Sequence, residues 1–206
     1  MDMDLSPLTA LALVCTLNRS PAESSSQLLA EQVLNELRTQ EVCTELVRVV
    51  DYDILPGVAV DMGEGDQWPQ LRQKILDADI LVLATPVWLG HPASVAQRVL
   101  ERINADISAT DEQGRPLLGG RAGIVAVVGN EDGAHKVVAD VVQGLNDCGF
   151  SFAPQAATYW VGEAMSGTDY KDLENTPDNV ASTTRALAVS TAHLARVLRE
   201  RPYPAL

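Results

Sequence analysis

The stretch Asp79-Ile80-Leu81-Val82-Leu83-Ala84-Thr85 decides the fold class, because its five central residues are all apolar. An apolar run without alternation is typical of a central parallel strand, which is buried on both faces. Four further segments of the chain are predicted to be strands: 8–15, 45–50, 122–128 and 150–159. Pro154 interrupts the last of them.

Longer amphipathic segments lie between the apolar runs. In 24–37 the apolar residues recur at helical spacing, and further helices are expected at 68–76, 94–103, 134–145 and 176–199. Alternating strands and helices predict a parallel sheet with helices on both faces. We therefore expect one α/β domain over residues 1–206, with five parallel strands in the order 2-1-3-4-5.

Composition narrows the classes of function. The 206 residues carry a formal net charge of −13, which disfavours nucleic acid and anionic membrane surfaces as partners. Three cysteines without a CxxC pair predict free thiols in a reducing compartment. The acidic N-terminus does not resemble a secretory signal, and the apolar runs are too short to span a membrane. We expect a soluble, cytoplasmic protein.

The segment after the first predicted strand is rich in hydroxyl groups. Ligands of open α/β sheets settle beyond the carboxyl ends of the strands. Backbone donors at a helix N-terminus, together with hydroxyls, make a cradle for one phosphate group. The candidate phosphate-binding residues are Thr16, Asn18, Ser20, Ser24, Ser25 and Ser26. The alternative is that the serines only cap the helix, although capping needs a single such residue.

Cys15 and Arg19 suggest a different chemistry. The segment Val14-Cys15 followed by Arg19-Ser20-Pro21 resembles the low-molecular-weight tyrosine phosphatases. Their signature places the arginine six positions after the nucleophilic cysteine, whereas Arg19 follows Cys15 by four. A thiol at the end of a strand would also lack the converging amides that lower its pKa. A hydrolase using Cys15 therefore remains a remote alternative.

The segment after the third strand is predicted to face the hydroxyl-rich segment across the sheet edge. Thr85-Pro86 predicts a sharp exit from the sheet, and Ser94 is expected to cap the next helix. Trp88 offers a wide apolar face for one side of a flat ring, although packing is its alternative role. Backbone amides nearby would meet the ring's polar edge. The candidate ligand contacts are Thr85, Pro86, Val87, Trp88, Leu89 and Gly90.

The segment after the fourth strand completes a three-sided pocket. Its glycines allow close approach of the backbone to a ligand, and Asn130 offers both a donor and an acceptor. The alternative is an ordinary turn in which Asp132 caps the helix. The candidate contacts are Gly129, Asn130, Glu131 and Gly133.

These segments together resemble the NAD(P)H-dependent FMN reductase and quinone reductase branch of the flavodoxin-like proteins. The segment Ala84-Thr-Pro-Val-Trp-Leu-Gly-His-Pro-Ala-Ser94, followed by Leu100-Glu-Arg102, is similar to that family's "TPVYWGSPSA … DR" pattern. Gly114-Arg-Pro-Leu-Leu-Gly-Gly-Arg121 is similar to its "GKPL-GK" connection. The family's "GSPR" opening is replaced here by Thr16-Leu-Asn-Arg, and its Asn-Thr at the helix start by Ser25-Ser26.

The resemblance implies a flavodoxin-like three-layer sandwich that binds FMN and uses NAD(P)H. It implies hydride transfer through flavin N5 to a small-molecule acceptor: a quinone, an azo or nitro compound, or a flavin. It also implies a homodimer or homotetramer. The flavin carries such chemistry, so no catalytic side chain and no metal are expected, and the dispersed His91, His135 and His193 agree. A flavodoxin-type electron carrier and a relative without cofactor are the alternatives.

Overall fold

The structure is a computed structural model, and it describes residues 6–164 and 166–205. Five parallel strands form its sheet in the order β2-β1-β3-β5-β6. Counting these five along the chain gives the predicted order 2-1-3-4-5, which is confirmed. Their bounds are β1 Thr9–Val14, β2 Cys43–Arg48, β3 Ile80–Trp88, β5 Ala122–Gly129 and β6 Ser151–Val161.

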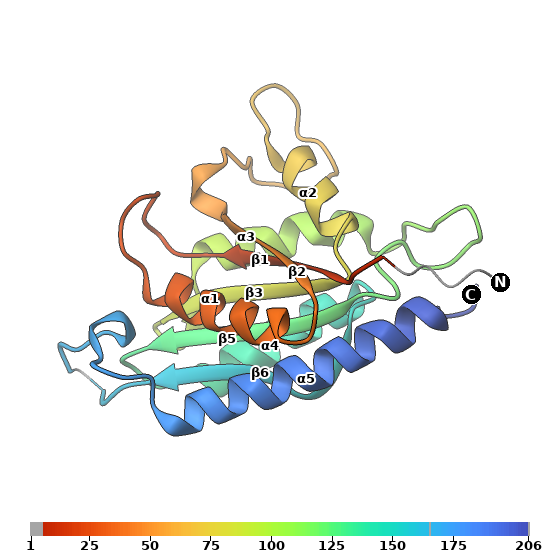
Figure 1. Cartoon of the computed structure of the whole chain (residues 1–206). Coiled ribbons are helices and arrows are strands. Elements are labelled where there is room, and N and C mark those ends of the chain that lie inside the picture. The colour runs from red at the N-terminus through yellow and green to blue at the C-terminus, as the bar shows by residue number, and fades with distance from the viewer. Residues whose placement is uncertain (1–5, 165, 206) are drawn as a thin grey trace.

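Helices cover both faces of the sheet (Figure 1). One face packs against α1 and α5, and the other against α2, α3 and α4. The bounds are α1 Ser25–Arg38, α2 Trp68–Leu76, α3 Ser94–Ile103, α4 Ala134–Asp147 and α5 Asp178–Glu200. Alternate residues of each central strand enter the two cores, as for Leu11 and Ala12 of β1. The apolar runs therefore mark strands buried on both faces.

The segment after residue 85 corrects one prediction. We expected Thr85-Pro86 to leave the sheet, but β3 continues to Trp88 and turns back as β4, His91–Pro92. The carbonyl of Ala84 accepts from Cys15 N just after β1 ends, and Pro86, two residues on, has no N–H to continue this ladder. Pairing with β1 therefore stops there, while Pro86 stays in register with Val128 of β5.

Three further local expectations are corrected. The N-cap of α3 is Ala93 rather than the predicted Ser94, and the alternative in which Asp132 caps α4 fails, because the N-cap is Gly133. The predicted strand 45–50 ends earlier, because Val49–Asp51 forms a short 3-10 helix, η1. The interruption expected at Pro154 is present as a register shift of β6 against β5, with Gln155 at φ 56°.

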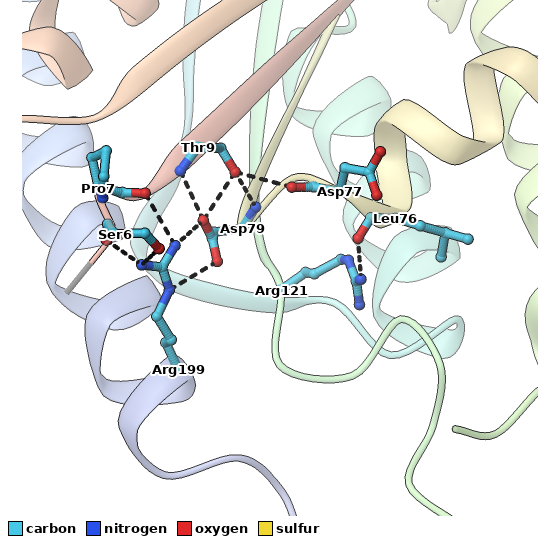
Figure 2. Close-up of polar contacts among 8 residues, drawn as sticks. All are labelled: Ser6, Pro7, Thr9, Leu76, Asp77, Asp79, Arg121 and Arg199. Carbon is cyan, nitrogen blue, oxygen red and sulfur yellow. Dashed lines mark hydrogen bonds and ion pairs between the residues drawn. The ribbon is translucent and has the colours of Figure 1, made fainter. Parts of the chain in front are cut away.

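The parallel strands all begin at one end of the sheet, which we call the amino edge; the end where they finish is the carboxyl edge. At the amino edge, a cluster of polar residues connects α5 to the start of β1 (Figure 2). The Asp79 carboxylate accepts from Thr9 N at 2.7 Å and from Thr9 Oγ1 at 3.0 Å. Arg199 of α5 donates to the same carboxylate and to the carbonyls of Ser6 and Pro7. These contacts stabilise the edge opposite the strand carboxyl ends.

Candidate functional site

A pocket of about 330 Å³ lies at the carboxyl ends of β1, β3 and β5. Three predicted segments contribute to it, so the structure brings together Ser24–Ser26, Trp88 and Asn130. Ten of the sixteen predicted contacts line it: Thr16, Asn18, Ser24, Ser25, Ser26, Pro86, Val87, Trp88, Gly129 and Asn130. The other lining residues are Leu17, Glu23, Val128, Trp160, Asp169, Tyr170 and Lys171.

The three serines at the start of α1 have three different roles. Ser24 is the N-cap, and its Oγ accepts from Gln27 N at 3.2 Å. Ser25 Oγ accepts from Lys171 N, also at 3.2 Å. Ser26 is only 3% exposed, yet its hydroxyl has no partner among residues 6–164 and 166–205. Capping therefore uses Ser24 alone, and the Ser26 hydroxyl remains available to a ligand in the pocket.

Two features around the serines favour an anion. The amides of Ser25 and Ser26 belong to the first turn of α1 and have no intrahelical acceptor. Thr16 is 7% exposed, and its hydroxyl has no partner in the described part of the chain. Unpaired donors at a helix N-terminus, where the dipole is positive, make an anion-binding end of the pocket.

Arg48, at the end of β2, holds this segment in shape, although the sequence analysis did not single it out. It is 5% exposed. Its Nη1 donates to the carbonyls of Asn18 and Ala22 at 3.2 and 2.7 Å, and its Nε donates to Gln27 Oε1 at 3.2 Å. A buried guanidinium normally has a charged partner. Here it bonds neutral oxygens behind the hydroxyl-rich segment, which adds positive potential at the anion-binding end.

The hairpin of β3 and β4 forms another wall. Trp88 and His91 pair across a two-residue turn, in which Leu89 and Gly90 both have positive φ. A turn of this kind brings the chain back directly, and a glycine in it avoids backbone strain. Trp88 lines the pocket and is 55% exposed, so its ring is not an ordinary core residue.

Six predicted contacts lie outside the pocket lining: Ser20, Thr85, Leu89, Gly90, Glu131 and Gly133. Two of them have other partners. Ser20 bonds Asp51, which lowers the pKa of that carboxyl, and buried Thr85 Oγ1 accepts from Ala93 N at 3.1 Å.

The remaining four join the hairpin to the segment before α4. Gly90 N donates to Glu131 Oε1 at 3.3 Å. A Cβ at Gly133, whose φ is 120°, would come within 2.7 Å of Gly90 Cα. Leu89, at the tip of the turn, is 89% exposed. These residues therefore fix the position of the turn beside the pocket.

The segment between β6 and α5 closes one side of the pocket, and the sequence analysis missed its residues. In Figure 1 it curls at the end of the sheet where β5 and β6 terminate. The short 3-10 helix η3, Tyr170–Asp172, brings Tyr170 and Lys171 to the lining. Asn130 Nδ2 donates to Ser166 O at 3.1 Å and so braces this segment. The irregular sequence after residue 161 was the only available signal of its importance.

Ionisable groups near the pocket do not form a nucleophilic site. Cys15 is fully buried, and burial raises the pKa of its thiol. Such a thiol is a poor nucleophile, which argues against the phosphatase alternative. Among the described residues, no group of three or more His, Cys, Asp or Glu side chains is arranged to hold a metal ion. No helix in the same residues is both long and apolar enough to cross a membrane.

The fold and the pocket define an α/β protein of the flavodoxin-like class with its site at the carboxyl edge of the sheet. Comparison with known families identifies the group within this class. The model of the NADPH-dependent FMN reductase family matches residues 9–165, and the chain belongs to this family. The resemblance stated from the sequence is thereby confirmed.

Three relatives are similar over most of the chain. The 8-demethyl-8-aminoriboflavin-5'-phosphate synthase of Streptomyces davaonensis is 39% identical, over 95% of this chain and 80% of that protein. A crystal structure of RosB with bound 8-demethyl-8-formylriboflavin-5'-phosphate has a TM-score of 0.86 and 35% identity, over 95% of this chain and 82% of that one.

The third is the divalent metal cation transporter MntH of Mycobacterium bovis, 39% identical over 93% of this chain. The chain spans only 29% of that protein's length. Flavodoxins match at 14% and 8% identity with TM-scores of 0.57 and 0.59, which shows the shared fold.

Proposed function

We propose that the protein binds FMN in the carboxyl-edge pocket and acts as an oxidoreductase that passes a hydride from NAD(P)H through flavin N5 to a small acceptor. The observation that carries this proposal is the mixed chemistry of the pocket lining. It combines unpaired hydroxyls and helix amides with the aromatic side chains of Trp88 and Trp160. A phosphate tail and a flat ring need these two kinds of partner.

The residues present fit the phosphate tail of FMN. Ser26 and Thr16 are at least nine-tenths buried, and their hydroxyls lack partners among the described residues. A ligand oxygen would accept from these hydroxyls without breaking an existing hydrogen bond. In the liganded state, Ser25, Ser26 and Thr16 would donate to phosphate oxygens, while Arg48 keeps their segment in place.

The aromatic side chains of the lining fit the isoalloxazine ring. Trp88 on the hairpin and Trp160 on β6 both line the pocket, and Trp88 is 55% exposed. The bound flavin supplies the hydride-transfer chemistry, and the protein's task is to orient the ring and leave one face open. The exposure of Trp88 is consistent with a second reactant reaching that face.

A second candidate uses the flavin as substrate rather than as cofactor. The Streptomyces davaonensis synthase is named for a riboflavin-5'-phosphate altered at position 8, and the RosB structure holds another. The same pocket would then bind FMN for modification of its ring. The use of NAD(P)H, for comparison, is supported only by the family's description.

Three further proposals follow from the sequence expectations. We propose a small-molecule acceptor such as a quinone, an azo or nitro compound or a free flavin, a homodimer or homotetramer, and a cytoplasmic location. Analytical ultracentrifugation and cell fractionation test the last two.

The deciding experiment starts with purified protein mixed with FMN, desalted and examined by visible spectroscopy. Retained flavin absorbance that bleaches on anaerobic addition of NADPH or NADH supports the reductase. Retained absorbance without bleaching, together with a new flavin mass by liquid chromatography and mass spectrometry after aerobic incubation, supports the substrate role. Retained absorbance with neither change supports an electron carrier, and absence of retained flavin contradicts all three.

A further inference from the structure

We propose that Lys171 neutralises the phosphate of the bound flavin and makes the pocket select flavin phosphates over riboflavin. This inference rests on the proposed binding of FMN. It assigns the selection to a segment that lies far from the hydroxyl-rich first segment in the sequence. Neither the phosphate-binding prediction nor the family pattern at residues 16–26 includes it.

Lys171 lies directly against the anion-binding end. Its backbone N–H donates to Ser25 Oγ at 3.2 Å. Its Nζ is 3.5 Å from Glu23 Oε2 and 2.8 Å from Asp172 Oδ1. Lys171, Glu23 and Ser25 all line the same pocket. The ammonium group is thus within reach of an anion held by the first turn of α1.

The segment that carries Lys171 is firmly anchored. Tyr170 is 2% exposed, its hydroxyl donates to Gln32 Oε1 at 2.6 Å, and its ring lies 5.5 Å from that of Trp160. Gln32 Nε2 also donates to Thr176 Oγ1 at 2.8 Å. The backbone of Lys171 is therefore fixed relative to α1, and only its side chain has to reorient toward a ligand.

No other cation has this access. Of the described residues that line the pocket, Lys171 is the only lysine or arginine. Arg19 is outside the lining and pairs with Asp53 at 2.8 Å on the exposed surface. Arg48 does not line the pocket, and it donates to the carbonyls of Asn18 and Ala22 in the hydroxyl-rich segment. Arg19 stands at the position of the arginine in the family's "GSPR" opening but does not line the pocket, whereas Lys171 does.

The present partners of Lys171 are exposed side chains. Glu23 and Asp172 are 84% and 49% exposed, and ion pairs in such positions are well screened by water. A phosphate dianion held by the helix amides attracts the ammonium more strongly than Glu23 does, because both charge and hydrogen bonds favour it. Phosphate binding is expected to draw Nζ away from Glu23.

The test compares Lys171→Gln with Lys74→Gln. Lys74 lies at the opposite edge, in an exposed pair with Glu45, so both variants lose one positive charge, with two ion pairs removed at Lys171 and one at Lys74. Dissociation constants for FMN and riboflavin are measured by calorimetry or flavin fluorescence. We expect Lys171→Gln to weaken FMN binding about tenfold, leave riboflavin within about twofold, and reduce the salt dependence of FMN binding. Lys171→Arg should retain most of the FMN affinity.

Three outcomes distinguish a failure of the inference about Lys171 from a failure of the proposed function. If the wild-type protein binds FMN but Lys171→Gln binds it as tightly as Lys74→Gln, Lys171 does not contact the phosphate, and the inference is wrong. If riboflavin and FMN weaken equally, Lys171 acts on the fold of the segment instead, which also overturns it. If the wild type binds neither flavin, the proposed function itself fails.

Discussion

The two edges of the sheet each have a cavity, and the larger one is not the candidate site. The cavity at the amino edge has a volume of about 390 Å³, against about 330 Å³ for the carboxyl-edge pocket. At the amino edge, Asp79 is bonded by Thr9 and Arg199, and Arg115 pairs with Asp111. At the carboxyl edge, the hydroxyls of Thr16 and Ser26, which line the pocket, lack partners within the described residues.

The partners of the charged side chains, rather than cavity size, distinguish the two edges. Polar groups that bond one another already contribute to stability, and a ligand would have to break those bonds first. Arg121, whose pKa burial lowers, donates through its Nη atoms to the carbonyls of Leu117 and Leu76, although its buried Nε has no partner among the described residues. The hydroxyls of Thr16 and Ser26 can instead bond a ligand without first losing a partner.

The largest predicted effect comes from Ser25→Asp. A carboxylate in the first turn of α1 would face the phosphate, and like charges at close range cost several kcal/mol. We expect FMN affinity to fall at least about 100-fold, as measured by fluorescence titration. The matched control is Ser94→Asp, because Ser94 is also the first residue of a helix but lies outside the pocket. Equal affinity of the two variants would refute the phosphate assignment.

Asp79→Ala tests the other edge. Removal of this carboxylate leaves Thr9 N and Arg199 without their shared acceptor, so we expect the free energy of unfolding to fall by about 2 kcal/mol. Urea denaturation measures this, and FMN affinity should be unchanged. Asp77→Ala is the control, because its side chain accepts only an exposed bond from Gln73. A loss of flavin affinity in folded Asp79→Ala would show that the edges are coupled.

Sequence reasoning predicted the sheet well because burial on both faces has a clear signature. The run at 79–85, the amphipathic segment at 24–37 and the helix at 68–76 each lie within a few residues of their observed bounds. The continuation of β3 through Pro86 was not predictable in this way. It depends on β1 ending beside it, which is a property of the neighbouring strand.

The candidate site was predicted in part for a similar reason. Segments that directly follow strands must meet at the carboxyl edge, so Ser24–Ser26, Trp88 and Asn130 could be placed from topology alone. Tyr170 and Lys171 could not, because their position depends on the bond from Tyr170 to Gln32 across 138 residues of sequence. The contacts of Arg48 could not be predicted either, because an arginine at the end of a strand is usually a surface residue.

Trp88→Ala tests whether Trp88 contacts the flavin ring. Stacking of a flat heterocycle on an aromatic side chain contributes roughly 1–3 kcal/mol, so we expect about tenfold weaker FMN binding and less quenching of flavin fluorescence. Leu89→Ala is the control, since Leu89 is the next residue, is more exposed and does not line the pocket. If both variants bind and quench like the wild type, Trp88 has no contact with the ring.

The smallest effect on FMN affinity is expected from Cys15→Ser, which tests whether the thiol contributes to the function of the pocket. Cys15 is fully buried, its pKa is raised by burial, and it does not line the pocket. FMN affinity and any flavin-dependent activity should therefore stay within about twofold of the wild type, while a buried serine hydroxyl lowers stability by about 1 kcal/mol. Because the thiol stays protonated between about pH 6 and 9, removing it should leave the pH profile unchanged. Aryl phosphate hydrolysis by the wild type that disappears in Cys15→Ser would instead make the thiol the reactive group, and the unpaired hydroxyls would then serve a phosphoryl substrate.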